Sequence, residues 1–206
     1  MVVIDDIKKI YSNRKVETVG KHRYFSVLLP IVEDEGILKI LFEIRSLTLD
    51  TQPGEVCLPG GEIEKFESPC EAALRETREE IGVTDIEILG QGDDLIPGFG
   101  FTMHTFIGKF GENYKQELKL SKDEVHDVFL VPIDWFMNNE PDTHILDIVQ
   151  LAKEDFPYDK IKFENGYNFR RGKAEVPIYV YEDKVIWGLT ARIINKFVKV
   201  LSTMKK

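Results

Sequence analysis

Short apolar runs through the middle of the chain predict a β-rich centre. Residues 22–32 and 37–45 are rich in Val, Ile, Leu, Tyr and Phe, and the polar stretch 33–36 separates them. This arrangement predicts a β-hairpin. The same kind of pattern predicts further strands near residues 86–89, 101–110, 125–131 and 176–181.

Helical spacing of apolar residues marks both ends of the chain and one central segment. It predicts an N-terminal helix over about 5–19 and a C-terminal helix over about 185–204. The clearest signal is at 68–81, where Ser68-Pro69-Cys70-Glu71 forms a capping box and Gly82 supplies the stop. We expect one domain over 1–206 with both terminal helices packed on it.

Two parts of the C-terminal half are less well defined. A short helix is expected to begin at Pro132-Ile133-Asp134. Residues 139–175 are polar and have no clear period, so they predict no element. Strands in the middle with helices on both sides indicate an α+β fold.

Charge and cysteine content narrow the class of function. The 206 residues include 36 acidic and 27 basic side chains, for a formal net charge of −9. Such an acidic surface argues against binding to nucleic acid or to anionic membranes. With only two cysteines and no secretory or peroxisomal signal, we expect a cytoplasmic protein.

Three carboxylates lie close together on the predicted helix 68–81. At 100° per residue, Glu76, Glu79 and Glu80 share an arc of about 100° beside the core-facing stripe. Hard oxygen ligands at this spacing suit Mg²⁺ or Mn²⁺. When the trio is considered alone, a solvated acidic helix face is the more common explanation.

The residues before the helix favour the chemical interpretation. Pro59-Gly60-Gly61 is a tight turn whose glycines allow a backbone carbonyl to approach a metal, or amides to approach a phosphate. Arg75 is expected to clamp Glu67 and so fix this loop onto the helix.

These residues together resemble the Nudix box. Every fixed position of that motif is filled at the right spacing, by Gly61, Glu67, Arg75, Glu76, Glu79, Glu80 and Gly82. The resemblance implies an α/β/α sandwich with a mixed central sheet, and hydrolysis of a nucleoside diphosphate linked to another group.

The resemblance also implies roles for the residues. Glu76, Glu79, Glu80 and the carbonyl of Gly60 would hold Mg²⁺ or Mn²⁺, and Arg75 and Glu67 would orient the helix. Which carboxylate takes the proton from the attacking water stays open. Glu124, just before the strand predicted at 125–131, is one candidate, and an ordinary surface charge is the alternative for it.

A second resemblance narrows the substrate. Arg45-Ser46, Gly54 and the Pro59-Gly60-Gly61 turn resemble the signature that precedes the box in coenzyme A pyrophosphatases. Asp50 stands where that signature has a basic residue, and Leu58 stands where it has Phe. Arg45, Gly54 and Gly61 are therefore candidate substrate contacts.

The expected reaction is cleavage of coenzyme A or its thioesters to 3′,5′-ADP and a 4′-phosphopantetheine fragment. Two alternatives stay open. One is a Nudix hydrolase of ADP-ribose, NADH or dinucleoside polyphosphates, and the other is a Nudix module that binds without catalysis. A small-molecule nucleotide is the expected partner. Nudix proteins often form homodimers, so segment 139–175 has either dimerisation or substrate binding as its candidate role.

Overall fold

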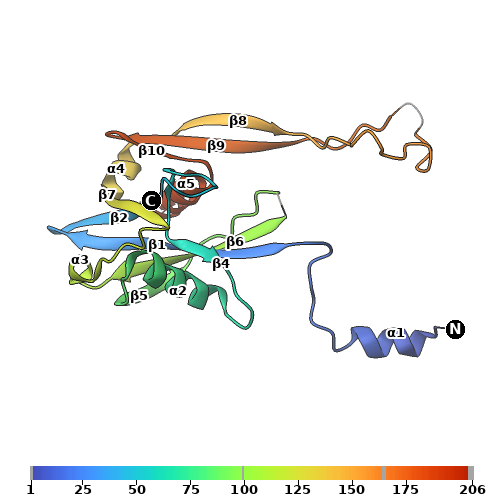
Figure 1. Ribbon diagram of the computed structural model, residues 1–206, viewed down its shortest axis with the longest axis horizontal. Helices are drawn as coiled ribbons and strands as arrows, with labels where there is room; N and C mark the ends of the chain where they lie inside the picture. The colour runs from blue at the N-terminus through green and yellow to red at the C-terminus, as the bar shows by residue number, and fades with distance from the viewer. Residues whose placement is uncertain (1, 99, 164–165, 204–206) are drawn as a thin grey trace.

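The computed structural model describes residues 2–98, 100–163 and 166–203. Figure 1 shows a central sheet with helix α2 (Pro69–Ile81) on one face and helix α5 (Gly188–Ser202) on the other. The predicted α+β sandwich is therefore confirmed.

The sheet mixes parallel and antiparallel pairs around β1 (Arg23–Asp34). β1 pairs antiparallel with β2 (Ile37–Arg45) and parallel with β6 (Phe101–Phe110). The first pair is the predicted hairpin. The remaining strands of this sheet are β3 (Val56–Cys57), β4 (Gly60–Glu62), β5 (Ile86–Gln91) and β7 (Val125–Pro132).

Strand β1 supplies the core on both faces of the sheet. Leu29 and Ile31 pack in the cluster that includes α5, whereas Leu28 and Val32 pack in the cluster that includes α2. A strand that is covered on both faces has no polar alternation, which explains its continuous apolar run. The β4 strand pairs with β1 and so brings the glycine turn against α2.

Helix α2 begins and ends where its sequence signals predict. The Ser68 side chain accepts a hydrogen bond from the Glu71 amide, and the Glu71 carboxylate accepts one from the Ser68 amide. Gly82 ends the helix with φ of 83°, a left-handed conformation that glycine adopts at little cost.

Replacing Gly82 with Ala is expected to lower the free energy of unfolding by about 1–2 kcal/mol, because the left-handed conformation disfavours a Cβ. The added Cβ would also lie 3.0 Å from the Glu117 carbonyl oxygen. Urea denaturation measures the loss. Gly90→Ala is the control, since its Cβ would meet nothing within 4 Å. Equal stability of both variants would contradict this role.

Both terminal helices are shorter than predicted. Helix α1 covers only Ile4–Tyr11, none of its residues is buried, and Figure 1 shows it standing away from the body. The expected helix over 5–19 is therefore wrong beyond Tyr11, where β-branched residues and Gly20 disfavour helix. The expectation that this helix packs on the domain is also wrong.

At the other end, residues 184–187 form strand β10 (Lys184–Trp187) instead of the first turn of α5. Val185 and Ile186 pair with Val180 and Tyr179, and β-branched residues suit such a ladder. The helix predicted to begin at 185 thus begins at Gly188. Residue 204, its predicted end, lies outside the described residues.

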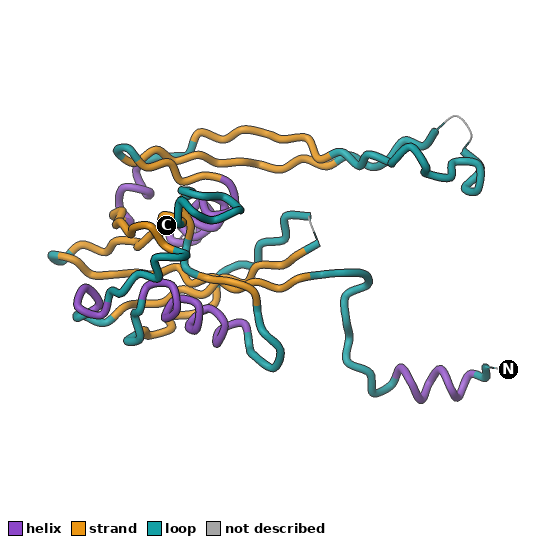
Figure 2. The backbone as a smooth tube through the Cα atoms, in the orientation of Figure 1, coloured by secondary structure: helices purple, strands orange, loops and turns teal. Residues whose placement is uncertain are grey.

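The unpatterned segment 139–175 contributes to a second sheet. β8 (Asp142–Ile148), β9 (Gly172–Tyr181) and β10 form a three-stranded antiparallel sheet. Its long pair, β8 and β9, forms an arm that continues as loop beyond the strands, as Figure 2 shows. Nearly all side chains of β8 are exposed. Because this strand has no buried face, its sequence has no apolar period.

Two short helices complete the described elements. They are α3 (Tyr114–Glu117) and α4 (Ile133–Asn138), and the second confirms the short helix expected after Pro132. Among the described residues, no helix combines the length and the apolar character needed to cross a lipid bilayer.

Candidate active site

Two adjacent glycines let strand β4 meet both β1 and helix α2. A Cβ on Gly60 would lie 2.3 Å from the Ser26 carbonyl oxygen and 2.6 Å from Val27 Cα. A Cβ on Gly61 would lie 2.3 Å from Glu76 Oε1. Neither position has room for a side chain, so the glycines allow the turn to contact the carboxylates of α2. Gly61, a candidate substrate contact, lies against Glu76.

Glu80 is the most buried carboxylate of the box. Its side chain accepts a hydrogen bond of 2.8 Å from the Gly60 amide, and only 8% of the residue is exposed. Burial raises the pKa of Glu80 to about 8, and the charges of Glu76 and Glu124 add to this effect. Helical spacing predicted Glu80 at the rim of the core, but strand β4 covers it.

Arg75 joins the loop before α2 to the carboxylates on it. Its guanidinium donates Nε and Nη2 to the two Glu67 oxygens at 2.8 and 3.1 Å, which is the predicted clamp in bidentate form. Its Nη1 donates to Glu76 Oε1 at 2.8 Å and Glu79 Oε2 at 2.9 Å. Arg75 therefore fixes the direction of three carboxylates.

The three box carboxylates differ in environment. The Glu76 side chain is 18% exposed and that of Glu79 is 55% exposed, whereas Glu80 is almost covered. Burial raises the pKa of Glu76, and the hydrogen bond from Arg75 opposes that rise. The site thus runs from a buried acid at the sheet to an exposed acid at the solvent.

A further buried acid, Glu43 on β2, lies beside this cluster. Only 1% of it is exposed, and its Oε1 has no hydrogen-bond partner among the described residues. Its other oxygen accepts a weak hydrogen bond of 3.8 Å from Cys57 Sγ. Burial and the nearby charge of Glu80 raise the pKa of Glu43 well above its ordinary value.

Sequence analysis overlooked Glu43 as a site residue. The available signal was a single carboxylate within the apolar run 40–44, on a strand that neighbouring strands cover on both sides. Burying an acid without an ion pair is costly, so such a residue suggests a function.

Arg45 and Glu124 lie at the same end of the sheet. The Ser46 amide donates to the Glu124 carbonyl at 2.8 Å. The positive charge of Arg45 lowers the pKa of both Glu43 and Glu80, and the negative charge of Glu124 raises both. The structure therefore brings Arg45 and Glu124 to the carboxylate cluster.

Gly54 supports this arrangement through its backbone. With φ of 72° it occupies the left-handed position of a turn in which the Glu55 amide donates to the Gln52 carbonyl, as expected for a Pro-Gly type II turn. Its own amide donates to the Arg45 carbonyl at 3.1 Å. Gly54 thus holds the loop against the strand end that carries Arg45.

The donor set fits a divalent cation. Carboxylates and a backbone carbonyl are hard oxygen ligands, and beside them Glu43 Oε1 is buried without a hydrogen-bond partner among the described residues. Within the described ranges, no three or more His, Cys, Asp or Glu side chains form a ready-made metal site. Arg75 instead holds Glu76 and Glu79.

The buried acids predict how the cation-free protein responds to pH. The folded protein keeps the Glu80 proton up to about pH 8, whereas the unfolded chain loses it near 4.5. Because the unfolded chain then binds fewer protons, the contribution of Glu80 to stability falls as pH rises between these values. In thermal unfolding in EDTA, we expect the melting temperature of Glu80→Gln to rise relative to that of the native protein as the pH increases from 5 to 8. A constant difference would contradict the raised pKa.

Comparison with known proteins identifies the family. Residues 20–151 match the model of the NUDIX domain. The chain is 31% identical over 194 residues to Nudix hydrolase 3 of Caenorhabditis elegans, covering 92% of this chain and 78% of that one. It is 31% identical over 184 residues to the mouse (Mus musculus) protein named peroxisomal coenzyme A diphosphatase NUDT7, covering 81% and 73%.

A solved structure supports the fold. The MutT/nudix family protein from Enterococcus faecalis aligns with a TM-score of 0.52 at 18% identity, covering 98% of this chain and 70% of that one. Together with the filled box and the Gly60–Glu80 contact, these matches show that the chain belongs to the Nudix family, as a hydrolase of phosphoric anhydride bonds that resembles the coenzyme A pyrophosphatases.

Proposed function

We propose that this protein is a Mg²⁺- or Mn²⁺-dependent pyrophosphohydrolase of coenzyme A or its thioesters. The products would be 3′,5′-ADP and a 4′-phosphopantetheine fragment. The observation that carries the proposal is the position of Arg45, whose charge acts on Glu43 and Glu80. A diphosphate bound to Arg45 would therefore lie beside the acids that attract a cation. The name of the mouse relative agrees with this substrate.

The cation would be held by Glu76, Glu79, Glu80 and the Gly60 carbonyl. When bound, it neutralises the diphosphate and lowers the pKa of the attacking water. Nudix hydrolases generally use such divalent ions. For Glu76 and Glu79 to serve as ligands, their hydrogen bonds to Arg75 must be exchanged or shared, whereas Arg75 keeps its bidentate pair with Glu67.

The chain's own groups would complete the reaction. The Arg45 guanidinium donates Nη2 to the Thr51 carbonyl at 3.4 Å, and it would bind a phosphate oxygen of the substrate through its outer nitrogens. Glu124 is exposed, and its charge acts on the buried acids Glu43 and Glu80 and on the partly exposed Glu76. Its carboxylate is our candidate for the base that accepts a proton from water.

Hydrolysis of coenzyme A, dephospho-coenzyme A and ADP-ribose, compared side by side with Mg²⁺ or Mn²⁺, tests the assignment. We expect coenzyme A to be cleaved preferentially, with 3′,5′-ADP as a product resolved by chromatography. Glu79→Gln is the control, because it removes one ligand charge at an exposed position. Cleavage of ADP-ribose with coenzyme A untouched would contradict the proposal.

A second candidate function is hydrolysis of ADP-ribose, NADH or a dinucleoside polyphosphate. Asp50 favours it, because a carboxylate stands where the coenzyme A signature has a basic residue. The same comparison of substrates separates the two. Cytoplasmic location, a homodimeric assembly and the lack of binding to nucleic acid or membranes stay predictions.

A further inference from the structure

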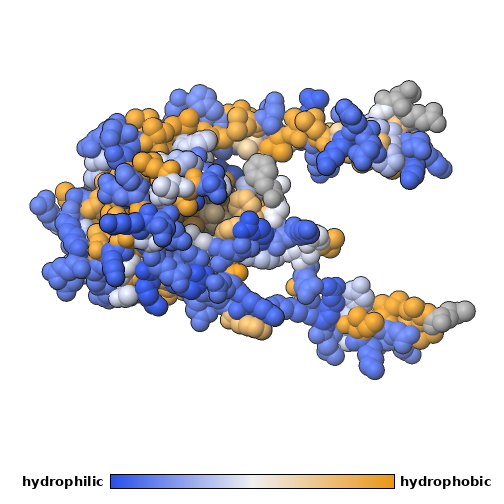
Figure 3. Space-filling view, viewed as in Figure 1, coloured by the Kyte–Doolittle hydropathy of each residue, from blue (hydrophilic) through white to orange (hydrophobic). Residues whose placement is uncertain are grey.

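A second charged feature lies on the other side of the sheet from α2. A cavity of about 420 Å³ opens between the arm, helix α5 and the loop that follows β5. In the space-filling view, a gap separates the arm from the body of the molecule (Figure 3). The volume of the cavity is typical of a site for a small molecule.

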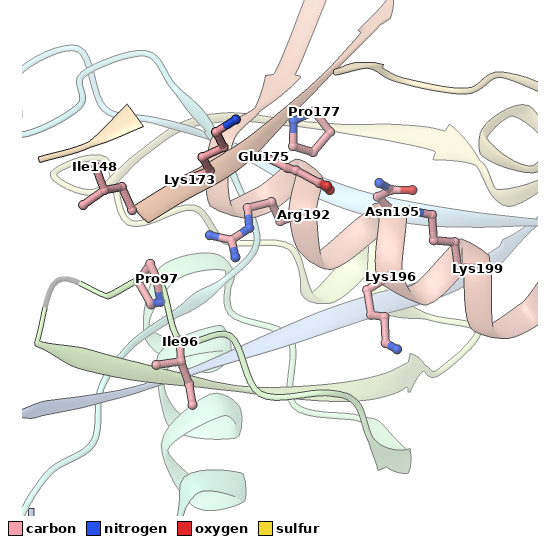
Figure 4. Close-up of a pocket in the computed structure, with 11 residues that line it drawn as sticks. Ile96, Pro97, Ile148, Lys173, Glu175, Pro177, Arg192, Asn195, Lys196 and Lys199 are labelled. Atoms are coloured by element: carbon pink, nitrogen blue, oxygen red, sulfur yellow. The ribbon is translucent and has the colours of Figure 1, made fainter. Parts of the chain in front are cut away.

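Four cations line this cavity. Arg192, Lys196 and Lys199 come from α5 and Lys173 comes from β9, and Glu175 is the one acidic residue among the lining residues described. Figure 4 shows Arg192 extending from α5 toward Pro97, with Lys196 further along the same helix. This cationic lining contrasts with the net charge of −9 on the whole chain.

The spacing of these cations is unfavourable for the helix itself. Arg192 and Lys196 are four residues apart, Lys196 and Lys199 are three apart, and like charges at these spacings repel. Within the described residues, the one ion pair that any of the four cations forms is Lys196 Nζ to Asp93 Oδ2 at 3.5 Å. An anionic ligand would relieve this repulsion.

The remaining lining indicates what the anion is attached to. Ile96, Pro97, Ile148 and Pro177 add apolar surface at the edges of the cavity. Cations beside apolar side chains suit a phosphate carried on a flat or apolar group. Bulk anions alone would not use the apolar part.

The helix that carries three of these cations also contacts the strand beside β2. Thr190, in the first turn of α5, donates its hydroxyl to the Val56 carbonyl at 3.3 Å. Val56 pairs with Ile44, between Glu43 and Arg45 on β2. Arg192 follows Thr190 by about 3 Å along the helix axis.

We propose that this cavity binds a phosphomonoester carried on an apolar or heterocyclic group. The phosphate has two potential sources, namely a phosphate remote from the bond that is cleaved in the substrate, or a separate phosphorylated ligand. The first source rests on the proposed function, whereas the binding site itself does not.

A binding experiment without divalent cations tests the site independently of catalysis. Calorimetry in EDTA compares adenosine 3′,5′-bisphosphate with adenosine, which carries no phosphate and should bind much more weakly. We expect Arg192→Gln/Lys196→Gln to weaken binding of the bisphosphate at least about tenfold, because two charge-assisted contacts are lost. Lys109→Gln on β6, a lysine outside the cavity, should bind like the native protein. Equal binding by the native protein and the double variant, or no saturable binding, would overturn the proposal.

A kinetic experiment separates the two sources of phosphate. If the substrate supplies the phosphate, the double variant should have a KM for coenzyme A about tenfold above that of the native protein. Its KM for dephospho-coenzyme A should be unchanged. If a separate ligand supplies it, both KM values stay unchanged while the bisphosphate still binds in the calorimeter. Lack of hydrolysis of either substrate would overturn the proposed function but not the binding site.

Discussion

Glu80→Gln is expected to lower kcat/KM on the order of 10³-fold, because it removes the carboxylate that links the Gly60 turn to the cation site. The variant should fold, since Gln has nearly the same shape as Glu and its side-chain carbonyl accepts a hydrogen bond from the Gly60 amide as Glu80 does. Steady-state rates with Mg²⁺ on the preferred substrate, together with the Mn²⁺ affinity, measure the effect.

Two controls make this result specific to the site. Glu87→Gln, at an exposed position on β5, changes the net charge equally and should keep full activity. Circular dichroism should show native secondary structure for both variants. If Glu80→Gln kept its activity within about threefold, less than 1 kcal/mol of transition-state stabilisation would be lost, and Glu80 would not be a cation ligand.

Gly60→Ala is expected to lower the free energy of unfolding by about 2–3 kcal/mol, since the pairing of β4 with β1 leaves no space for a methyl group. The added Cβ would lie 2.3 Å from the Ser26 carbonyl oxygen and 2.6 Å from Val27 Cα. Backbone atoms cannot move aside as a flexible side chain does. We therefore also expect the Gly60 amide to lose its hydrogen bond to Glu80, and activity to fall with it.

Urea denaturation and kinetics on the same preparation test this prediction. Gly36→Ala, in the β1–β2 hairpin, is the matched control, because it also has positive φ, 76°, but its Cβ would meet nothing within 4 Å. It reports the cost of an alanine at positive φ without a clash, whereas Gly60 itself has a φ of 153°. A loss of stability for Gly60→Ala no larger than that of Gly36→Ala would show that β4 is able to shift without cost.

The elements that sequence analysis predicted correctly have local signals. The capping box joins Ser68 to Glu71 and the Gly82 amide bonds to Arg78, so each signal acts within a few residues, and together they define α2 in the structure as they do in the sequence. The hairpin of β1 and β2 is likewise local. The spacing of the box alone indicated the Glu67–Arg75 pair, since Glu67 directly precedes the N-cap of α2 and Arg75 lies about two turns into the helix.

The errors and omissions arose where distant contacts decide the outcome. Val185 and Ile186 pair with Val180 and Tyr179 of β9 instead of beginning α5, and a helical period does not register that pairing. Glu43 shows the same limit for the site. Nothing near it in sequence indicates that Cys57 and Glu80 lie beside it.

The sequence by itself determined the family, the carboxylates on α2 and the glycine turn, because a helix repeats every 3.6 residues and a tight turn needs glycine. Only the tertiary structure decided how deeply each acid is buried, and hence that the pKa values of Glu80 and Glu43 are raised. Burial depends on strands far apart in the chain that cover a side chain from both sides, and no local pattern encodes that cover.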